Sequence, residues 1–147
     1  EKGRDGCRTP MIWNAQAEFG GFSTAKPWLP VKAPQAEQAV DRQEDDPASV
    51  LNHYRDVLAF RGQSEALLHG DTEFLDLPDP ILGFLRKSGD ASVLCLFNLR
   101  KDDVALKLAG DFEAIGPMNA DLDAKNLRLP GSGFIWLEDR GDLTVSA

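Results

Sequence analysis

The stretch DPASVLNHYRDVLAFRG, residues 46–62, separates two kinds of sequence and decides how the rest of the chain folds. Asp46 is a good N-cap residue, and Pro47 follows at the first helical position, where its missing N–H costs nothing. Apolar or amphipathic side chains then recur at the spacing of one helix face, and Gly62 supplies a stop. These side chains are Val50, Leu51, Tyr54, Val57, Leu58 and Arg61. The stretch therefore predicts a helix over residues 47–61.

After Gly62 the sequence changes to short apolar runs separated by turn residues. The runs are residues 74–77, 81–86, 93–98, 104–108, 112–115, 127–129 and 134–137. Their length and spacing are typical of an all-β domain, and Lys87-Ser88-Gly89-Asp90 is a hairpin signal because glycine adopts positive φ. We expect residues 65–147 to form an antiparallel sandwich of about seven or eight strands. Most aromatic residues of this region fall inside the apolar runs, which predicts that they lie in the core: Phe74, Phe84, Phe97, Phe112, Phe134 and Trp136.

Before Asp46 the sequence shows no sustained period. Residues 1–45 contain several prolines and the Gly20-Gly21 pair, which predicts a long irregular loop. A disordered linker would be poor in aromatic residues, whereas this segment carries Trp13, Phe19, Phe22 and Trp28. We therefore expect the loop to pack against other structure.

The composition excludes several classes of protein. The chain has 147 residues with 42% hydrophobic content and no apolar run near the length of a membrane span, so no membrane partner is expected. Its 16 basic and 24 acidic side chains give a net charge of -8, which argues against a nucleic-acid partner. Cys7 and Cys95 are far apart and indicate free thiols, while His53 and His69 are too few and too distant for a zinc site. We expect no metal and no cofactor.

The N-terminal segment carries the most distinctive motifs. They are GRDGCRTPMIW at residues 3–13, GFS at 21–23 and PWLPV at 27–31, and the series continues through Gln43, residues 46–51, Tyr54-Arg55 and residues 58–61. Together these motifs resemble the C-terminal part of the α-glucosidase and oligo-1,6-glucosidase branch of glycoside hydrolase family 13, in the α-amylase superfamily. The first sixty or so residues match by motif, and the remainder matches by position and β character.

The resemblance implies an α+β fragment: the end of a (β/α)8 barrel, formed by a long loop and the last helix, followed by an all-β antiparallel C-terminal sandwich domain. The expected domains are residues 1–64 and 65–147. The parent enzyme would be a retaining hydrolase that removes terminal α-linked glucose from small oligosaccharides or α-glucosides. In the family the catalytic carboxylates lie on barrel strands N-terminal to these motifs. We therefore expect this segment alone to be inactive and its partner to be the N-terminal catalytic barrel of the same protein. As a separate prediction, we expect the protein in the cytoplasm.

Arg8 is the strongest candidate for a site residue. A guanidinium donates five hydrogen bonds in a planar fork, so it can hold a carboxylate and still reach sugar hydroxyls. The resemblance implies that Arg8 contacts the glucose unit in subsite −1, whereas spacing alone favours a role in bracing the loop. Arg4 and Asp5 are weaker candidates for outer subsites, because an adjacent Arg-Asp can equally form a local ion pair. Trp13 and Trp28 could stack on sugars but are more typical of buried anchors.

Two other functions stay open. A self-standing β-sandwich that binds carbohydrate or a partner would present aromatic side chains at every second position on one exposed sheet face. Within the family, glucosyl transfer, sucrose isomerisation and trehalose synthesis occur on related scaffolds. Ile12 and the stretch 17–19 depart from the usual family pattern, which leaves the linkage preference undetermined.

Overall fold

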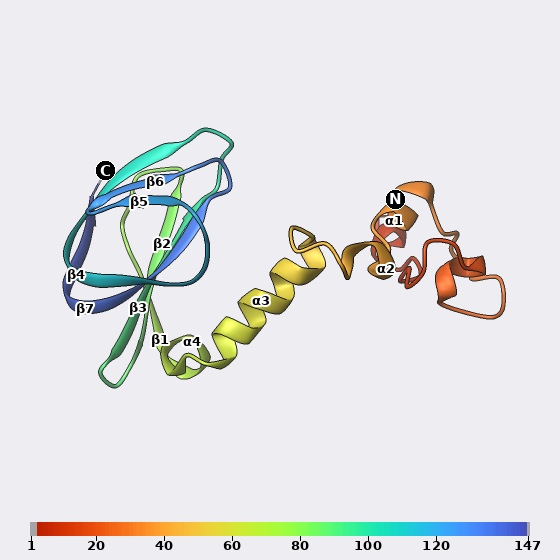
Figure 1. The fold of residues 1–147 in the computed structure, drawn as a ribbon, viewed down its shortest axis with the longest axis horizontal. Coiled ribbons are helices and arrows are strands. Elements are labelled where there is room, and N and C mark those ends of the chain that lie inside the picture. The colour runs from red at the N-terminus through yellow and green to blue at the C-terminus, as the bar shows by residue number, and fades with distance from the viewer. Residues whose placement is uncertain (1–2, 147) are drawn as a thin grey trace. The chain divides into compact units, whose positions relative to one another are not determined.

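The computed structural model describes residues 3–146 (Figure 1). The chain divides into two compact units, the first ending at Asp56 and the second beginning at Val57. In the described part, the N-terminal unit contains the short helices η1 (Asp5–Cys7), η2 (Glu18–Gly21), α1 (Ala33–Glu37) and α2 (Val40–Gln43). Helix α3 (Val50–Gly62) runs across the boundary, and the C-terminal unit contains α4 (Glu65–His69) and a sheet of seven strands.

Backbone hydrogen bonds tie the two ends of the N-terminal segment together. The Val40 N–H donates to the Ile12 carbonyl at 3.0 Å, and the Asp41 N–H donates to the Trp13 carbonyl at 3.1 Å. Gly20 accepts from the Trp13 N–H at 2.9 Å. The prediction of one irregular loop over residues 1–45 is wrong where α1 and α2 form, because helices of 5 and 4 residues are too short to show an apolar period.

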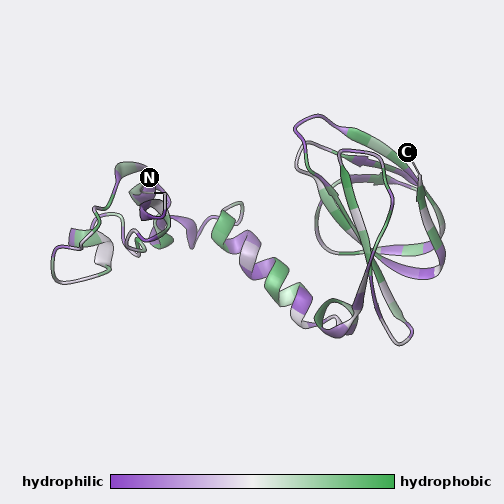
Figure 2. Cartoon of the chain, turned by 180° about the vertical axis from the view of Figure 1, so that it is seen from behind, coloured by the Kyte–Doolittle hydropathy of each residue, from purple (hydrophilic) through white to green (hydrophobic). Residues whose placement is uncertain are grey.

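Helix α3 confirms the predicted helix, but it begins at Val50 and not at residue 47. The Ser49 Oγ accepts from the Asn52 N–H at 3.2 Å, which makes Ser49 the capping residue in place of Asp46. The Asp46 carboxylate instead accepts from the Ala48 N–H at 2.9 Å, in a turn that precedes the helix. Hydrophobic residues recur along α3 between hydrophilic ones (Figure 2), as its sequence pattern indicates.

The seven strands form one antiparallel sheet in the order β1-β2-β3-β7-β4-β6-β5. The strands are β1 (Asp71–Phe74), β2 (Ile81–Ser88), β3 (Ala91–Asn98), β4 (Val104–Asn119), β5 (Asp121–Asp123), β6 (Asn126–Leu129) and β7 (Phe134–Ser146). The predicted hairpin is confirmed, because Ser88 pairs with Ala91 across Gly89, whose φ is +56°. The predicted strand at 74–77 is wrong, since pairing with β2 uses the preceding residues, and β5 was not predicted.

The predicted strands 104–108 and 112–115 are parts of the single long strand β4. Gly110 lies at a shift in the register between β4 and β7 and has a φ of +94°. A Cβ at this position would lie 2.4 Å from the Asp142 carbonyl oxygen, so the close approach of the two strands requires glycine. The bulge bends β4 and β7 without interrupting the pairing.

The main core lies inside the curled sheet. Nine buried residues of five strands form one cluster: Ile81, Leu94, Leu96, Leu106, Leu108, Leu127, Leu129, Ile135 and Leu137. β2 and β6 are separated by three strands in the sheet order, which in a flat sheet would hold their side chains roughly 19 Å apart. Because Ile81 of β2 and Leu127 of β6 belong to the same cluster, the sheet must fold over onto itself. A continuous sheet thus encloses the core that two separate sheets of a sandwich would enclose.

The outer face of β2, β3 and β7 carries a second cluster. Val93 and Cys95 of β3 pack there against Ala66 and Leu67 of α4, with Phe60 of α3 nearby. The prediction that the aromatic residues of this region are core residues is wrong for Phe74, which is 70% exposed. Phe84, Phe97, Phe134 and Trp136 are half-buried on this outer face, whereas Phe112 packs against the main core.

Candidate functional site

Arg8 follows the short helix η1 and is exposed. Its backbone N–H donates to the Asp5 carbonyl at 3.3 Å, which fixes the turn that presents the side chain. The Arg8 guanidinium has no hydrogen bond or ion pair with any of the residues that the structure describes. The bracing role that spacing favours therefore has no counterpart among these residues.

Arg4 and Asp5 lie in the same turn. The Arg4 carbonyl accepts from the Cys7 N–H at 3.3 Å and from the Cys7 thiol at 3.1 Å. Arg4 is exposed and Asp5 is partly exposed, and no ion pair joins them in the described part of the chain. The local ion pair between Arg4 and Asp5 that the sequence suggested is therefore not formed.

Hydrogen bonds and close contacts define the conformation of the loop after this turn. The Asn14 side-chain oxygen accepts from the Gln16 and Ala17 N–H groups at 2.8 and 3.0 Å, and the Asp41 carboxylate accepts from the Ala15 N–H at 3.1 Å. Gly20 has a φ of +67°, and a Cβ there would lie 2.8 Å from the Ile12 Cδ1. These contacts define the backbone conformation of residues 12–20.

The two tryptophans of this unit are not buried. Trp13 is 54% exposed and Trp28 is 84% exposed, so the expectation that they are buried anchors is wrong for the part of the chain described. Trp28 lines an open cavity of about 560 Å³ together with Phe19, Lys26 and Pro27. Arg4, Asp5 and Arg8 do not line this cavity. The structure thus holds the predicted arginines and the aromatic cavity in one unit without joining them into one pocket.

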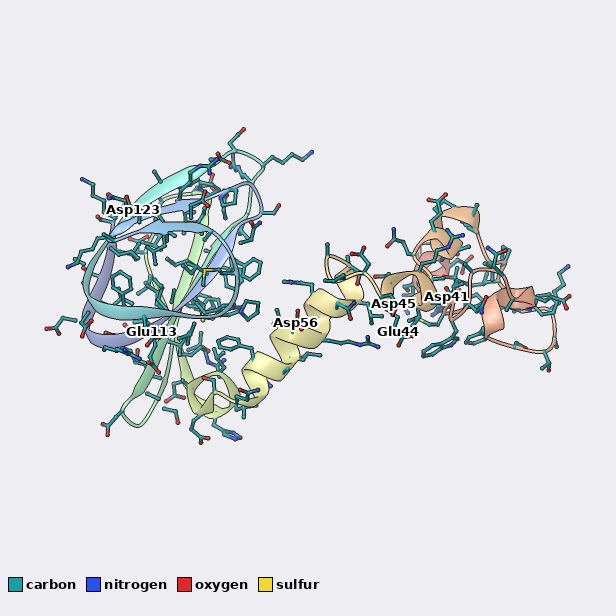
Figure 3. The ribbon with its side chains drawn as sticks, in the orientation of Figure 1. Asp41, Glu44, Asp45, Asp56, Glu113 and Asp123 are labelled. Atoms are coloured by element: carbon teal, nitrogen blue, oxygen red, sulfur yellow. The ribbon has the colours of Figure 1, made fainter. Side chains whose placement is uncertain are left out.

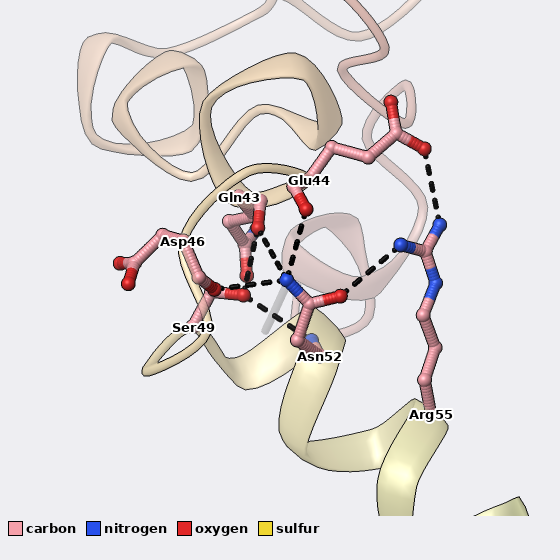
Figure 4. A network of polar contacts seen from close by, with 6 residues as sticks. All are labelled: Gln43, Glu44, Asp46, Ser49, Asn52 and Arg55. Carbon is pink, nitrogen blue, oxygen red and sulfur yellow. Dashed lines mark hydrogen bonds and ion pairs between the residues drawn. The ribbon is translucent and has the colours of Figure 1, made fainter.

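A polar network fixes the start of α3 (Figure 4). The Asn52 side-chain amide donates to the carbonyls of Gln43, Glu44 and Asp46 at 3.0, 3.0 and 2.8 Å. Arg55 donates to the Asn52 side-chain oxygen at 3.1 Å and forms an ion pair with Glu44 at the same distance. Sequence reasoning matched Gln43 and Arg55 to the family but missed Asn52, which lies in the first turn of α3. The network is structural, because it satisfies carbonyls at the turn before the helix.

The carboxylates are distributed over the molecule and not gathered into a centre. Figure 3 shows Asp41, Glu44 and Asp45 around α2, whereas Glu113 and Asp123 lie on strands of the sheet. Arg128 donates to both Asp103 and Asp121, and such exposed pairs contribute little to stability. Among residues 3–146, no group of three or more histidine, cysteine or acidic side chains could hold a metal ion.

The two thiols have opposite environments. Cys7 is exposed and Cys95 is buried in β3, and both are free. Burial raises the pKa of the Cys95 thiol to about 12, against a smaller lowering by the Arg86 guanidinium. A thiol with this pKa stays protonated at neutral pH and is a poor nucleophile.

Among residues 3–146, none of the helices has the length and apolar character of a membrane span.

Comparison with known protein families matches residues 1–70 to the catalytic domain of alpha amylase. The chain is 53% identical over 135 residues to a probable alpha-glucosidase of Rhizobium meliloti (strain 1021), and this alignment covers 91% of the chain and 22% of the relative. It is 30% identical over 147 residues to the probable oligo-1,6-glucosidase 2 of Bacillus subtilis (strain 168), covering 95% of the chain and 26% of that relative.

Among solved structures, the α-glucosyl transfer enzyme XgtA superposes with a TM-score of 0.85 at 41% sequence identity. The match covers 93% of the chain and 26% of XgtA. The chain thus spans between 22% and 26% of the length of these three proteins. The likeness extends beyond the segment that matches the catalytic domain, since most of the chain is aligned in each case.

Proposed function

Because this chain belongs to the α-amylase family of glycoside hydrolases, we propose that it is the C-terminal portion of an α-glucosidase that removes terminal α-linked glucose from small oligosaccharides or α-glucosides. In this proposal residues 1–64 complete the catalytic barrel and residues 65–147 form a supporting β domain. The observation that carries it is the Arg8 turn, which presents a guanidinium without a partner among the described residues and lies within the match to the catalytic domain.

The reaction would proceed by double displacement on carboxylates outside this chain. One carboxylate attacks the anomeric carbon while a carboxylic acid protonates the departing oxygen, so that the glycosidic bond breaks and a glucosyl ester forms. The second group then takes a proton from water, which attacks the same carbon and releases glucose. Arg8 would bind hydroxyls of the glucose unit in subsite −1 and pair with an aspartate from elsewhere in the barrel. Arg4 and Asp5 would line outer subsites.

The exposed face of α3 supports the placement of this chain against further barrel structure. Val50, Tyr54 and Leu58 lie four residues apart on one face of α3 and are 62%, 63% and 61% exposed. A stripe of three large side chains on one helix face is typical of a helix that packs against other structure. In the proposed enzyme, this stripe packs against a barrel strand outside the chain.

The test uses the full-length protein that contains this chain, with 4-nitrophenyl α-glucoside, maltose and isomaltose as substrates. We expect Arg8→Ala to lower kcat/KM by roughly two orders of magnitude or more, because a charged donor to the substrate is lost. The thermal unfolding midpoint should stay unchanged, because the side chain is exposed. Arg42→Ala, an exposed arginine of α2, is the matched control and should retain full activity. Normal turnover by Arg8→Ala would remove Arg8 from the site.

Hydrolysis and glucosyl transfer share the first chemical step and differ in the acceptor. XgtA is described as an α-glucosyl transfer enzyme, which favours transfer as a second activity of the proposed enzyme. Incubation of the full-length protein with concentrated maltose separates the two: glucose alone indicates hydrolysis, whereas trisaccharides indicate transfer. Sucrose isomerisation is tested in the same way from the products of sucrose.

A carbohydrate-binding role for the β domain is the second candidate. Half-buried rings lie at alternate positions of β7, as a stacking platform would require, and Phe74 is largely exposed, but β3 contributes a single ring, Phe97. Phe97 is stacked on Phe84 at 22°, but Phe74 lies at 62° to Phe84 and Trp136 at 86° to Phe97. The rings therefore do not share one plane, which disfavours a flat platform. Calorimetry of the 147-residue chain with maltose and isomaltose tests this role, and millimolar or tighter binding would support it.

A further inference from the structure

One face of the sheet carries an unusual row of rings. We call it the aromatic face and define it by Phe74, Leu82, Phe84, Phe97, Phe134 and Trp136. Strand register places Leu82, Phe97 and Phe134 side by side in one row. The next row contains Phe74, Phe84, Cys95 and Trp136. Side chains in register on adjacent strands point to the same side, so these rings form one continuous surface.

This surface is only partly covered. Val93 and Cys95 are 3% and 0% exposed beneath α4, whereas Phe74 is 70% exposed at the other side of the face. The centre of the Phe60 ring of α3 lies 5.8 Å from that of Trp136, so Phe60 also covers part of the aromatic face. The covering residues, Phe60, Ala66 and Leu67, all belong to the segment that matches the alpha amylase catalytic domain. The residues that cover this face thus lie near the C-terminal end of the segment that matches that domain.

A small cavity lies where the cover meets the sheet. It has a volume of about 170 Å³ and is lined by Arg61, Arg86 and Trp136 together with apolar side chains of α3, α4 and β2. The Arg86 Nε and the Trp136 Nε1 are buried and have no hydrogen-bond partner among the described residues. Arg86 makes one long hydrogen bond, from Nη2 to the Leu67 carbonyl at 3.4 Å. The cavity is therefore lined by donors that lack an acceptor.

The neighbouring carboxylates do not supply this acceptor. Arg86 faces Val93 in register, and Val93 in turn faces Glu138 of β7. Glu138 is held by Arg140, whose Nε donates to it at 3.1 Å. Glu73 of β1 is likewise held by Lys87 at 2.7 Å. Arg86 is half-buried, but its Nε is buried without an acceptor, and such a group is costly to desolvate. The cavity therefore calls for a carboxylate from elsewhere.

We propose that the aromatic face and its cavity form the docking surface for the body of the catalytic domain, and that an acidic side chain from that body enters the cavity and accepts hydrogen bonds from Arg86, Arg61 and Trp136. The proposal rests on the proposed function, which supplies the rest of the catalytic domain. The proposal is supported by the residues that already cover part of this face, Phe60, Ala66 and Leu67, because they belong to the segment that matches the catalytic domain. A neutral sugar would cover the rings but leave the guanidinium charge unpaired.

The decisive experiment uses the Arg86→Lys variant of the full-length protein and a zero-length carbodiimide cross-linker. The reagent activates a carboxylate, an amine in contact attacks the activated carbonyl, and an amide forms as the urea leaves. We expect the amine at position 86 to couple to an aspartate or glutamate outside residues 1–147, which peptide mass spectrometry then identifies. Lys87 and Glu73, joined at 2.7 Å, provide an internal positive control for the reagent.

Three results would overturn the proposal: coupling of position 86 to a carboxylate within residues 1–147, coupling to a second copy in a mixed isotope-labelled sample, or no coupling while the Lys87–Glu73 cross-link forms. α-Glucosidase activity is measured on the unmodified protein. Activity without the expected cross-link rejects the docking surface and leaves the proposed function standing. The cross-link without activity rejects the function and leaves the docking surface standing.

A second measurement does not depend on Arg86. Phe74→Ser should lower the thermal unfolding midpoint of the full-length protein by several degrees, since the ring would be buried by docking. Leu99→Ser is the matched control, because Leu99 is 67% exposed and lies outside the aromatic face. In the 147-residue chain both variants should unfold like the unaltered chain. Equal midpoints of the two full-length variants would contradict the proposal.

Discussion

The C-terminal unit buries nine apolar side chains of its sheet in one cluster, while the N-terminal unit buries few and exposes many. In the described part of the N-terminal unit, the buried apolar residues include Ile12 and Ala39, at 5% and 0% exposure. The same unit exposes more than half of several large side chains: Met11, Trp13, Phe22, Trp28, Val50 and Tyr54. Exposed apolar surface on this scale is typical of a region that packs against other structure, which agrees with the proposed catalytic barrel.

The two units are consequently held by different forces. In the C-terminal unit, burial of apolar surface contributes most, at about 25 cal/mol per Å². In the N-terminal unit, side-chain hydrogen bonds to backbone groups define the turns, as the contacts of Asn14, Asp41 and Asn52 illustrate. Such bonds contribute about 1 kcal/mol each after exchange with water. They specify a conformation more than they stabilise it. We therefore predict that the C-terminal unit is more resistant to unfolding than the N-terminal unit.

The largest effect is expected from the core of the sheet. Leu96 is fully buried at the centre of the main cluster. Leu96→Ala should lower the free energy of unfolding by about 2–5 kcal/mol, because it removes buried methyl groups and leaves a cavity. Urea denaturation of the 147-residue chain followed by far-UV circular dichroism measures the change. Leu99→Ala, at 67% exposure, should change it by less than about 0.5 kcal/mol. Equal losses would mean that the sheet does not carry the stability of its unit.

The helix network offers the corresponding test in the N-terminal unit. Asn52→Ala leaves the carbonyls of Gln43, Glu44 and Asp46 without their donor, so we expect a loss of about 1–3 kcal/mol confined to the turn before α3. Amide hydrogen exchange should speed up at residues 49–52 and stay unchanged in β3. Asp56→Ala, in the same helix, controls for the change in helix propensity. Faster exchange throughout the sheet would show that the two units unfold together.

A smaller effect is expected at the left-handed glycine of the N-terminal loop. Gly20→Ala places a Cβ at a φ of +67° and 2.8 Å from the Ile12 Cδ1, which should cost about 1–2 kcal/mol. Limited proteolysis should cut the segment 14–28 faster in this variant. Gly6→Ala is the control, because no atom lies within 4 Å of a Cβ built there. If both variants are cut at the rate of the unaltered chain, the loop is not fixed by Gly20.

The sequence predicted elements best where one signal dominated. Two short apolar runs and the glycine of the hairpin between them were sufficient to locate β2 and β3. Two signals competed at the start of α3, since Asp46 and Ser49 are both good caps, and the choice depended on side-chain contacts that the sequence does not show. β4 was divided in two because Gly110 resembles a turn residue, whereas it forms a bulge against β7. Helix α4 was missed because five residues are too few for a period.

The candidate site was predictable only in part, for a different reason. The motif around Arg8 indicated the family, and the comparisons agree with that resemblance. The role of Arg8 depends on a substrate and on carboxylates outside the chain, so it stays a prediction. The aromatic residues of the sheet were misread because hydrophobicity alone cannot distinguish a core from a covered outer face. Only strand register shows that Phe84 and Phe97 lie on the side opposite to Leu94 and Leu96.

The smallest effect is expected at the two thiols, of which each unit holds one. Burial raises the pKa of Cys95 from 9.0 to about 12, so the folded state keeps this thiol protonated where the unfolded chain ionises it. The stability from the protonated thiol is fully present below pH 9 and is lost as the pH rises toward 12. At pH 9 half of the unfolded chains carry the thiolate, which corresponds to a loss of about 0.4 kcal/mol.

Urea denaturation of the 147-residue chain at pH 7, 9 and 10 measures this loss. The Cys95→Ala variant starts from a lower stability, because it leaves a small cavity, but its stability should fall less steeply between pH 9 and 10. Cys7→Ser, which replaces the exposed thiol of the N-terminal unit, should keep the slope of the unaltered chain. The same slope in Cys95→Ala would mean that the outer face of β3 admits water. In that case α4 and Phe60 would not seal this part of the aromatic face, and the cavity beside Arg86 would be open to solvent before any docking.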